Sequence, residues 1–330
     1  MDKQWVLKKH GVTQGFLAAW LTCPELARLR YQEGWTVIGA SGALMFGQVV
    51  HWVLDAVYTD FANEKVAPPT TNEAVQQYTR VVEGLWRREN PMATAADLEQ
   101  LEECLGMAEA VLPFYFQHWT ADFQKTDWLA LELSFEELWS LPLKTVRSKP
   151  RGVWIRGKLD GVRRVNGKLW LFETKTKGRV ESEAIVDTLS MDLQVNLYLW
   201  VIQQIYEETP VGTVYNIIRR PGLKRGGSET LEDFCARIAK DVVTRPDHYF
   251  MRFESVAEET EHKAWQENLT VVLDRLSDWA KKGKDHFKNP ISCQGRYGVC
   301  DMAGLCLRGD PGRLRVRDTV FPELEEGGGL

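Results

Sequence analysis

The sequence predicts an α/β fold in which a mixed central sheet is flanked by helices, with a helical N-terminal region and a C-terminal cysteine region packed against it. Three observations predict this fold. β-rich runs begin at about residue 128 and alternate with a helical pattern up to about residue 220. Helical patterns fill most of the chain before these runs. A long helical pattern and then a loop with three cysteines follow them.

The size and composition indicate a globular protein with a sizeable core. The chain has 330 residues, a formal net charge of −5 and 44% hydrophobic residues, which suits one elaborated domain spanning 1–330. Its expected parts are a helical N-terminal part at 1–120, an α/β core at 121–255, and a C-terminal part at 256–330 with a helix, a cysteine loop and an acidic tail. Neither a run of eighteen apolar residues nor a signal-peptide pattern is present. We therefore expect an intracellular, cytoplasmic protein without a membrane partner.

The N-terminal region is predicted to be helical from its capping residues and apolar spacing. Thr22 has the features of an N-cap, which puts Cys23 at the start of a helix. A second helix, expected at 41–64, carries Gly47 and His51 four residues apart and therefore on one face. A histidine in such an apolar helix is more often a hydrogen-bonded core residue than a metal ligand.

The stretch 157–177 predicts a β-hairpin that carries two opposed acids. Its two β-rich runs are separated by Asn166-Gly167, and both residues favour the positive φ that a two-residue type I′ turn needs. Counting outward from this turn puts Asp160 opposite Glu173, at about 4.5–5.5 Å between Cβ atoms. The period of two puts Lys175 on the same face as Glu173. Two carboxylates so close repel each other unless a cation lies between them.

The elements around the hairpin follow the same rules of periodicity. A strand at 128–135 contains Glu132 among apolar residues, where a charge lies either on the solvent face or against a cation. A helix at 187–206 places Gln194 and Tyr198 on one face. The other expected elements are two helices within 68–119, a strand at 211–220, helices from 229 onward and a long amphipathic helix at 258–282.

The hairpin is a basic island in an acidic protein. Between Lys144 and Arg179 the chain has twelve lysines or arginines and two acids, which are Asp160 and Glu173. Paired carboxylates with a nearby lysine suit Mg²⁺ or Mn²⁺ and phosphodiester hydrolysis, and the basic residues would contact phosphates. Glycoside hydrolysis is the competing use of close carboxylates, but the local positive charge fits a polyanionic substrate better. No nucleotide-binding motif is present, so a motor activity would have to come from another polypeptide.

The six cysteines divide into two groups. Cys104 and Cys235 lie in helical runs and are most simply packing residues. Cys23 and three cysteines of the C-terminal loop form a candidate metal cluster. The loop cysteines are Cys293, Cys300 and Cys306.

The order of these motifs resembles the RecB-like branch of the PD-(D/E)xK nucleases. The elements that carry the resemblance, in chain order, are Gly47-x-x-x-His51, Glu132 on a strand, Gly157-x-x-Asp160, Glu173-Thr174-Lys175 and Gln194-x-x-x-Tyr198. The resemblance implies a restriction-endonuclease-like core at 121–255. It also implies that His51, Asp160 and Glu173 bind the catalytic metal, with the carbonyl of Thr174 as a further ligand. Lys175 would be catalytic, and Gln194 and Tyr198 would shape the site or the DNA path.

The cysteines resemble the iron-sulfur subset of that branch, which includes the CRISPR-adaptation exonuclease and the AddB subunit of recombination nucleases. The resemblance implies that Cys23, Cys293, Cys300 and Cys306 hold a 4Fe-4S cluster, with zinc as the less favoured occupant. In the relatives the first two C-terminal cysteines are closely spaced, whereas here six residues separate Cys293 from Cys300.

We therefore expect a metal-dependent DNA nuclease, and specifically an exonuclease that acts on single-stranded DNA ends in recombination, repair or DNA processing. The alternative is a DNA-end-binding subunit of a larger recombination or CRISPR-adaptation assembly, with conditional or no independent nuclease activity. A helicase or an integrase would be the partner in such an assembly.

Overall fold

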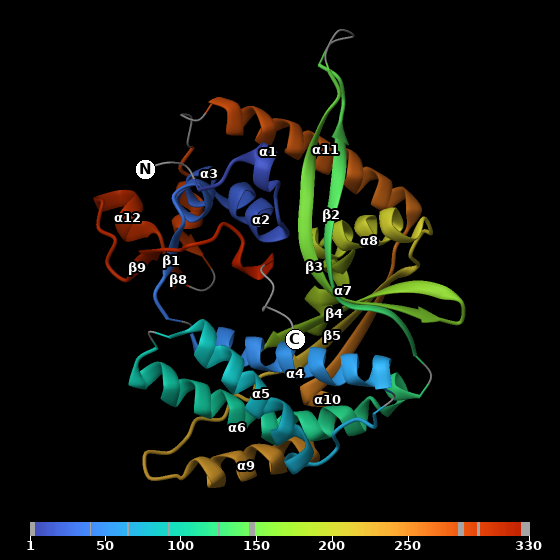
Figure 1. Ribbon diagram of the computed structural model, residues 1–330, viewed down its shortest axis with the longest axis vertical. Helices are drawn as coiled ribbons and strands as arrows, with labels where there is room; N and C mark the ends of the chain where they lie inside the picture. The colour runs from blue at the N-terminus through green and yellow to red at the C-terminus, as the bar shows by residue number, and fades with distance from the viewer. Residues whose placement is uncertain are drawn as a thin grey trace.

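The computed structural model describes residues 4–39, 41–64, 66–91, 93–124, 126–144, 149–282, 287–295 and 298–324. The end of the predicted acidic tail, at 325–330, lies outside the described residues. The α/β fold is confirmed: a five-stranded mixed sheet is flanked by helices (Figure 1).

The central sheet has the strand order β2-β3-β4-β5-β6. β4 and β5 pair in parallel, and the other neighbours pair antiparallel. Short strands form two further pairs, β1 with β9 and β7 with β8. The strands are β1 (Trp35–Val37), β2 (Asp127–Leu141), β3 (Arg151–Val165), β4 (Lys168–Lys177), β5 (Gly212–Arg219), β6 (Phe250–Val256), β7 (Gln294–Gly295), β8 (Gly298–Val299) and β9 (Leu314–Val316).

Helices cover both faces of this sheet (Figure 1). The α-helices are α1 (Leu7–His10), α2 (Gln14–Thr22), α3 (Pro24–Ala27), α4 (Gly42–Glu64), α5 (Asn72–Glu89), α6 (Ala95–His118), α7 (Ser182–Thr188), α8 (Leu193–Tyr206), α9 (Leu231–Thr244), α10 (Pro246–Tyr249), α11 (Glu259–Lys282) and α12 (Ala303–Arg308). A π-helical turn, η1 (Arg28–Gln32), follows α3, and 3₁₀ turns lie at η2 (Thr120–Phe123), η3 (Leu189–Met191), η4 (Pro290–Cys293) and η5 (Pro322–Leu324).

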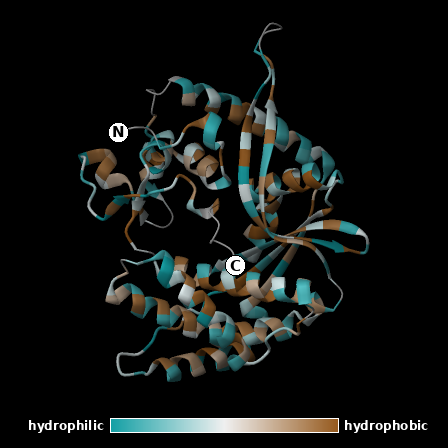
Figure 2. Cartoon of the chain, viewed as in Figure 1, coloured by the Kyte–Doolittle hydropathy of each residue, from teal (hydrophilic) through white to brown (hydrophobic). Residues whose placement is uncertain are grey.

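Two hydrophobic cores hold these helices on the sheet. One core joins the β3–β4 hairpin to α2, α8 and α11. The other joins α4, α5, α6 and α9 to the ends of β5 and β6. Along β3 the buried residues alternate, as at Val153, Ile155 and Leu159, and Figure 2 shows hydrophobic and hydrophilic bands alternating along β2 and β3. The period-two pattern thus gives the hairpin one face for the core and one for other contacts.

The N- and C-terminal regions lie together, as the sequence predicts. β1 pairs with β9, with Trp35 opposite Val316. A hydrogen bond from Arg317 Nη2 to the carbonyl oxygen of Arg30, at 2.7 Å, adds to this contact. Segments that are about 280 residues apart in the sequence therefore share one small sheet.

Two local predictions are wrong, and one strand was not predicted. Thr22 is the last residue of α2 rather than an N-cap, and Cys23 is itself the N-cap of α3. The helix expected from residue 187 begins at Leu193 because Asp192 caps it, with Oδ1 accepting the N–H of Gln194 at 2.9 Å. β6 was not predicted, since Phe250–Val256 follows a helix directly and forms a strand by pairing with β5.

Candidate active site

The β3–β4 hairpin begins at the predicted type I′ turn. Asn166 has a φ of 52° and Gly167 a φ of 78°, which is the left-handed conformation that this turn needs. The ladder runs without a bulge from the turn to the pair Gly161–Phe172. Asp160 and Glu173 lie one residue beyond that pair. The predicted register is therefore confirmed as far as the adjacent pair, Gly161 and Phe172. At this step the Asp160 Oδ2 atom accepts the backbone N–H of Thr174 at 2.6 Å.

Glu173 and Lys175 form the inner part of the site. The Glu173 side chain is 1% exposed and forms an ion pair with Lys175. Gln194 bridges the two, because its Nε2 donates to Glu173 Oε1 at 2.8 Å and its Oε1 accepts from Lys175 Nζ at 3.0 Å. Tyr198 lies one turn later on α8 and donates its hydroxyl to the carbonyl oxygen of Lys158 at 2.9 Å. The four side chains therefore form one connected array, as their predicted faces require.

His51 from α4 completes the outer part of the site. One ligand atom each of His51, Glu132 and Asp160 lies within 4.8 Å of the others, a spacing at which one metal ion could bind all three. The His51 Nδ1 and Asp160 Oδ1 atoms are 3.8 Å apart. The side chains of His51 and Asp160 are 31% and 21% exposed, so this group is open to a substrate.

The sequence left open whether Glu132 lies on the solvent face or against a cation. Its φ is 47°, which is unusual for a residue other than glycine within a strand. Its side chain forms a 2.6 Å ion pair with Lys158. It also belongs, with His51 and Asp160, to the group of side chains that could hold a metal ion, called the metal group below. A strained backbone of this kind clusters at functional sites. The signal in the sequence was a single acid within an apolar strand.

Asp55, which the sequence analysis did not single out, lies beside His51, Glu132 and Asp160. It follows His51 by one turn of α4 and is 6% exposed. With His51, Glu132 and Asp160 it lines a cavity of about 20 Å³, which has room for one water molecule or one ion. The spacing of four residues from His51 was the available signal.

The electrostatics of the site are those of crowded carboxylates. Burial, and then the charges of Asp160 and Asp55, raise the pKa of Glu132 to about 8. Burial and the charge of Asp160 raise the pKa of Glu173 to about 7. The pKa of Asp160 is also raised by burial. These acids therefore hold protons more tightly than usual, and a cation among them would favour their ionised forms.

The two basic groups at the site behave in opposite ways. Burial and the Lys175 charge lower the pKa of His51 to about 4, so its imidazole is neutral near pH 7 and able to bind a metal. Burial acts to lower the pKa of Lys175, but the charges of Glu173 and Asp160 outweigh it and hold that pKa above its usual value. Lys175 is therefore a permanent cation.

Gly47 allows α4 to approach β4 closely. A Cβ atom at Gly47 would lie 2.7 Å from Thr176 Oγ1. We expect Gly47→Ala to push α4 away from the sheet and to lower the free energy of unfolding by about 1–3 kcal/mol. The control is Gly84→Ala on α5, where nothing lies within 4 Å and helix propensity predicts a gain of about 0.5–1 kcal/mol. Urea unfolding compares the two, and an equal response of both variants would contradict the close packing.

Many cations of the basic island already have acidic partners in the structure. The ion pairs are Lys144–Asp278, Arg151–Asp274, Arg156–Glu136, Lys158–Glu132, Arg163–Asp122, Arg164–Glu208, Lys175–Glu173 and Arg179–Glu181. The island is therefore less positive than its sequence suggests, because acids outside the stretch 144–179 pair with most of these cations. Arg179 remains 81% exposed at the side chain and can still reach a phosphate.

A family model for the PD-(D/E)XK nuclease superfamily matches residues 12–307. The chain belongs to the PD-(D/E)XK nuclease superfamily. In this nuclease Asp160 and Glu173-Thr174-Lys175 follow the order of residues in the family name, with Leu159 in place of the proline. Nucleases of this superfamily act on DNA and use divalent metals, and the spacing of His51, Glu132 and Asp160 is one that could hold such an ion.

Other comparisons add little to the family match. No curated protein matches this nuclease in sequence. A crystal structure described as that of SSO0001 is 14% identical to it, over 74% of this chain and 78% of that chain, with a TM-score of 0.28. Among the described residues of this nuclease, no helix is both long and apolar enough to cross a membrane.

The four candidate cluster cysteines of the nuclease lie around one segment. The N–H of Asn289 donates to Cys23 Sγ at 3.3 Å, and the Cys293 thiol is 3.8 Å from the carbonyl oxygen of Asn289. The N–H of Cys300 donates to the carbonyl oxygen of Cys293 at 2.9 Å, and Lys288 Nζ donates to the carbonyl oxygen of Cys306 at 3.0 Å. Within the described residues, no three of the cysteine sulfurs lie within 4.8 Å of one another.

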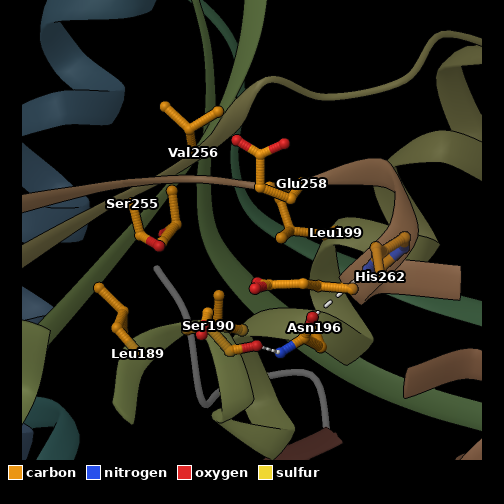
Figure 3. Close-up of a pocket in the computed structure, with 12 residues that line it drawn as sticks. Leu189, Ser190, Asn196, Leu199, Ser255, Val256, Glu258 and His262 are labelled. Carbon is orange, nitrogen blue, oxygen red and sulfur yellow. Dashed lines mark hydrogen bonds between the residues drawn. The ribbon is translucent and has the colours of Figure 1, made fainter. Parts of the chain in front are cut away.

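A second cavity of the nuclease lies away from the active site, between α8, α11 and the start of β5 (Figure 3). His262 Nδ1 lies 3.3 Å from Asn196 Oδ1, and Asn196 Nδ2 donates to the carbonyl oxygen of Ser190 at 2.8 Å. The cavity volume of about 10 Å³ is the lower limit for one water molecule. This cavity is therefore too small for a substrate.

Proposed function

We propose that the protein is a metal-dependent DNA exonuclease of the RecB-like branch, which hydrolyses phosphodiester bonds at single-stranded DNA ends with Mg²⁺ or Mn²⁺. The observation that carries the proposal is the group of His51, Glu132 and Asp160 beside the Glu173–Lys175–Gln194 array. One imidazole and several carboxylates form an oxygen-rich donor set that suits these ions.

The residues present fit such a metal. Glu173 Oε2 is a buried oxygen without a hydrogen-bond partner, although burying an unsatisfied carboxylate oxygen is costly. A cation near it would supply the missing interaction. We propose His51, Glu132, Asp160 and Glu173 as side-chain ligands, with the Thr174 carbonyl as a further ligand.

The bound metal would polarise the scissile phosphate and lower the pKa of the attacking water. Lys175 stays protonated, so it acts as a cation that offsets negative charge developing on the phosphate rather than as a general base. Glu173 and Gln194 hold its Nζ atom from two sides, which fixes its position before the substrate arrives. Tyr198 lies 3.3 Å from Gln194 Nε2 and fixes that amide in turn.

Binding of the metal should depend on pH because protons compete for its ligands. The raised pKa values of about 8 for Glu132 and about 7 for Glu173 mean that both carboxyls carry protons at pH 6.5 in the metal-free protein. His51 is already neutral at that pH. We expect Mn²⁺ affinity to rise by more than about tenfold per pH unit near pH 6.5, where two protons must leave the ligands, by less than about tenfold per unit near pH 8, and then to level off.

The same pKa shifts predict the stability of the metal-free protein. A carboxyl whose folded pKa is raised from 4.5 to about 8 binds more protons folded than unfolded, so stability falls as pH rises through this range. Saturating Mn²⁺ should remove the fall between about pH 6.5 and 8. Thermal melts with and without Mn²⁺ test this sign, and a metal-free melting temperature that rises over the same range would contradict it.

Digestion of linear and circular DNA tests the proposed activity. We expect the pure protein with Mn²⁺ to degrade end-labelled linear single-stranded DNA and to leave a circular single strand of the same sequence intact. A chelator should abolish the reaction. Cleavage of the circle would contradict exonuclease action, and no cleavage of either substrate would contradict the proposed function.

The intact Lys175–Glu173–Gln194 array favours catalysis over DNA-end binding alone. We also propose that the protein works with a helicase or an integrase, because its sequence has no nucleotide-binding motif that could drive strand separation. Co-purification with such a partner tests this association.

We further propose that Cys23, Cys293, Cys300 and Cys306 hold a 4Fe-4S cluster, as in the iron-sulfur subset of the branch. One observation supports this. The N–H···S bond from Asn289 to Cys23 is of a kind that stabilises a cluster thiolate.

A further inference from the structure

We infer that a buried polar network centred on Asp122 holds the two sides of the metal group in place, and that the Tyr58 hydroxyl is the positioning group for His51. The inference rests on the proposed function, because it concerns the metal group proposed there to be catalytic. Nothing in the sequence pattern singled out Tyr58 or Asp122. The inference follows from the hydrogen bonds that join them to both sides of the site.

Asp122 is a buried carboxylate with three donors. It is 2% exposed and accepts from Arg252 Nη1 at 2.8 Å and from the Tyr58 hydroxyl at 2.7 Å. Arg163 Nη1 lies 3.4 Å from the same carboxylate. A buried charge is stable only when it is paired and hydrogen-bonded, so the positions of these partners are closely linked.

Tyr58 connects this network to the helix that carries His51. Both residues are on α4, seven residues apart and therefore two turns along one face. Tyr58 also lines the small cavity that His51 lines. Its ring stacks on Phe123 with centroids 5.0 Å apart, and its hydroxyl lies 3.1 Å from that of Tyr115. The hydroxyl therefore fixes the rotation of α4, and with it the approach of His51 to the metal.

A chain of hydrogen bonds connects the same network to Asp160. Arg252 Nε donates to Asn216 Oδ1 at 3.0 Å, and Asn216 Nδ2 donates to Thr174 Oγ1 at 3.2 Å. Thr174 in turn donates its backbone N–H to Asp160 Oδ2 at 2.6 Å. Asn216 is 0% exposed, so water cannot replace these bonds readily. The network thus reaches Asp160 on β3 directly and reaches α4, the helix that carries His51, through Tyr58.

This arrangement matters because metal ligands must be positioned accurately. His51 and Asp160 come from separate elements, and a metal accepts them only over a narrow range of distance and angle. Residues that orient ligands typically change metal affinity by about 10–100-fold when they are altered. Loss of one hydrogen bond of the network should therefore lower the affinity for the metal more than it lowers the rate of hydrolysis at saturating metal.

The test compares two tyrosines that each donate to an aspartate. Tyr58→Phe removes the hydroxyl that bonds to Asp122. Tyr78→Phe is the matched control. The Tyr78 hydroxyl, on α5, donates to Asp60 Oδ2 on α4 at 2.9 Å, and this hydrogen bond lies outside the network. Mn²⁺ binding is measured without DNA, from the loss of the electron paramagnetic resonance signal of free Mn²⁺. We expect Tyr58→Phe to weaken binding by about tenfold and Tyr78→Phe to bind like wild type.

A second variant keeps the inference testable if Tyr58→Phe does not fold. Thr174→Val removes the Oγ1 acceptor of Asn216 but keeps the carbonyl proposed as a ligand, and we expect a similar loss of affinity. In Tyr58→Phe the Mn²⁺ concentration for half-maximal cleavage should rise, while the rate at saturating Mn²⁺ stays near that of wild type. Unchanged Mn²⁺ affinity in the folded variants, or an equal loss in Tyr78→Phe, would overturn the inference.

Failure of the proposed function would look different. Wild-type protein would then cleave no DNA end, or would bind no Mn²⁺ at all, and in the second case the inference would fall with it. Wild-type binding together with unchanged variants would overturn the positioning role alone.

Discussion

Replacing Lys175 by alanine is expected to lower the rate of DNA cleavage by about 10²–10³-fold, the usual cost of removing a group that stabilises developing charge. Mn²⁺ binding should persist or become tighter, because Lys175 is a half-buried cation next to the proposed ligands and repels the metal. Steady-state cleavage of end-labelled DNA, with Mn²⁺ binding measured on the same samples, separates the two effects.

Lys168→Ala is the matched control for this experiment. Lys168 is at the exposed turn end of β4, the strand whose other end carries Lys175. Its loss should leave cleavage within about twofold of wild type, since an exposed lysine far from the site adds little to a catalytic step. Full activity of Lys175→Ala, or equal losses in both variants, would show that Lys175 has no catalytic role.

Replacing Cys23 by alanine is expected to remove the iron-sulfur cluster and to lower the melting temperature by roughly 10 °C. A metal site contributes several kcal/mol to folding, and each kcal/mol shifts the melting temperature by about 2–4 °C in a domain of this size. The cluster would connect residue 23 to residues 293–306, and so would close a very long loop. Visible absorbance, iron content and thermal melts measure the effect.

Cys104→Ala is the control for the loss of a buried thiol. Cys104 is 1% exposed and lies in α6, away from the candidate cluster. This variant should keep the iron and colour of wild type and lose only the small packing energy of its sulfur. A colourless wild-type protein whose stability is unchanged in Cys23→Ala would contradict the cluster.

Local signals in the sequence were sufficient for the hairpin. Asn166-Gly167 determines both the turn type and the register as far as Gly161–Phe172. Because side chains alternate along a strand, the turn also places Lys175 on the face of Glu173. Helix periodicity correctly placed Gln194 and Tyr198 on one face of α8. These predictions succeeded because each depends on residues that are close in the chain.

Contacts between distant elements could not be predicted in this way. Glu132 lies in the metal group and has a positive φ, which no local sequence pattern indicates. Asp122 is important because Tyr58 and Arg252 reach it from α4 and β6, and β6 itself forms only by pairing with β5. The basic island loses much of its charge to acids that come from other elements. Such features depend on tertiary packing, which overrides local preference.

Binding of Mn²⁺ to wild-type protein and to Asp160→Asn at about pH 8 tests the central claim most directly, since Glu173 is largely ionised there. The claim is that the side chains gathered around Asp160 hold the catalytic metal. We predict that wild type binds Mn²⁺ and that Asp160→Asn binds it at least about tenfold more weakly, because an amide oxygen replaces a charged ligand. Equal binding by the two proteins, or no binding by wild type, would contradict the claim.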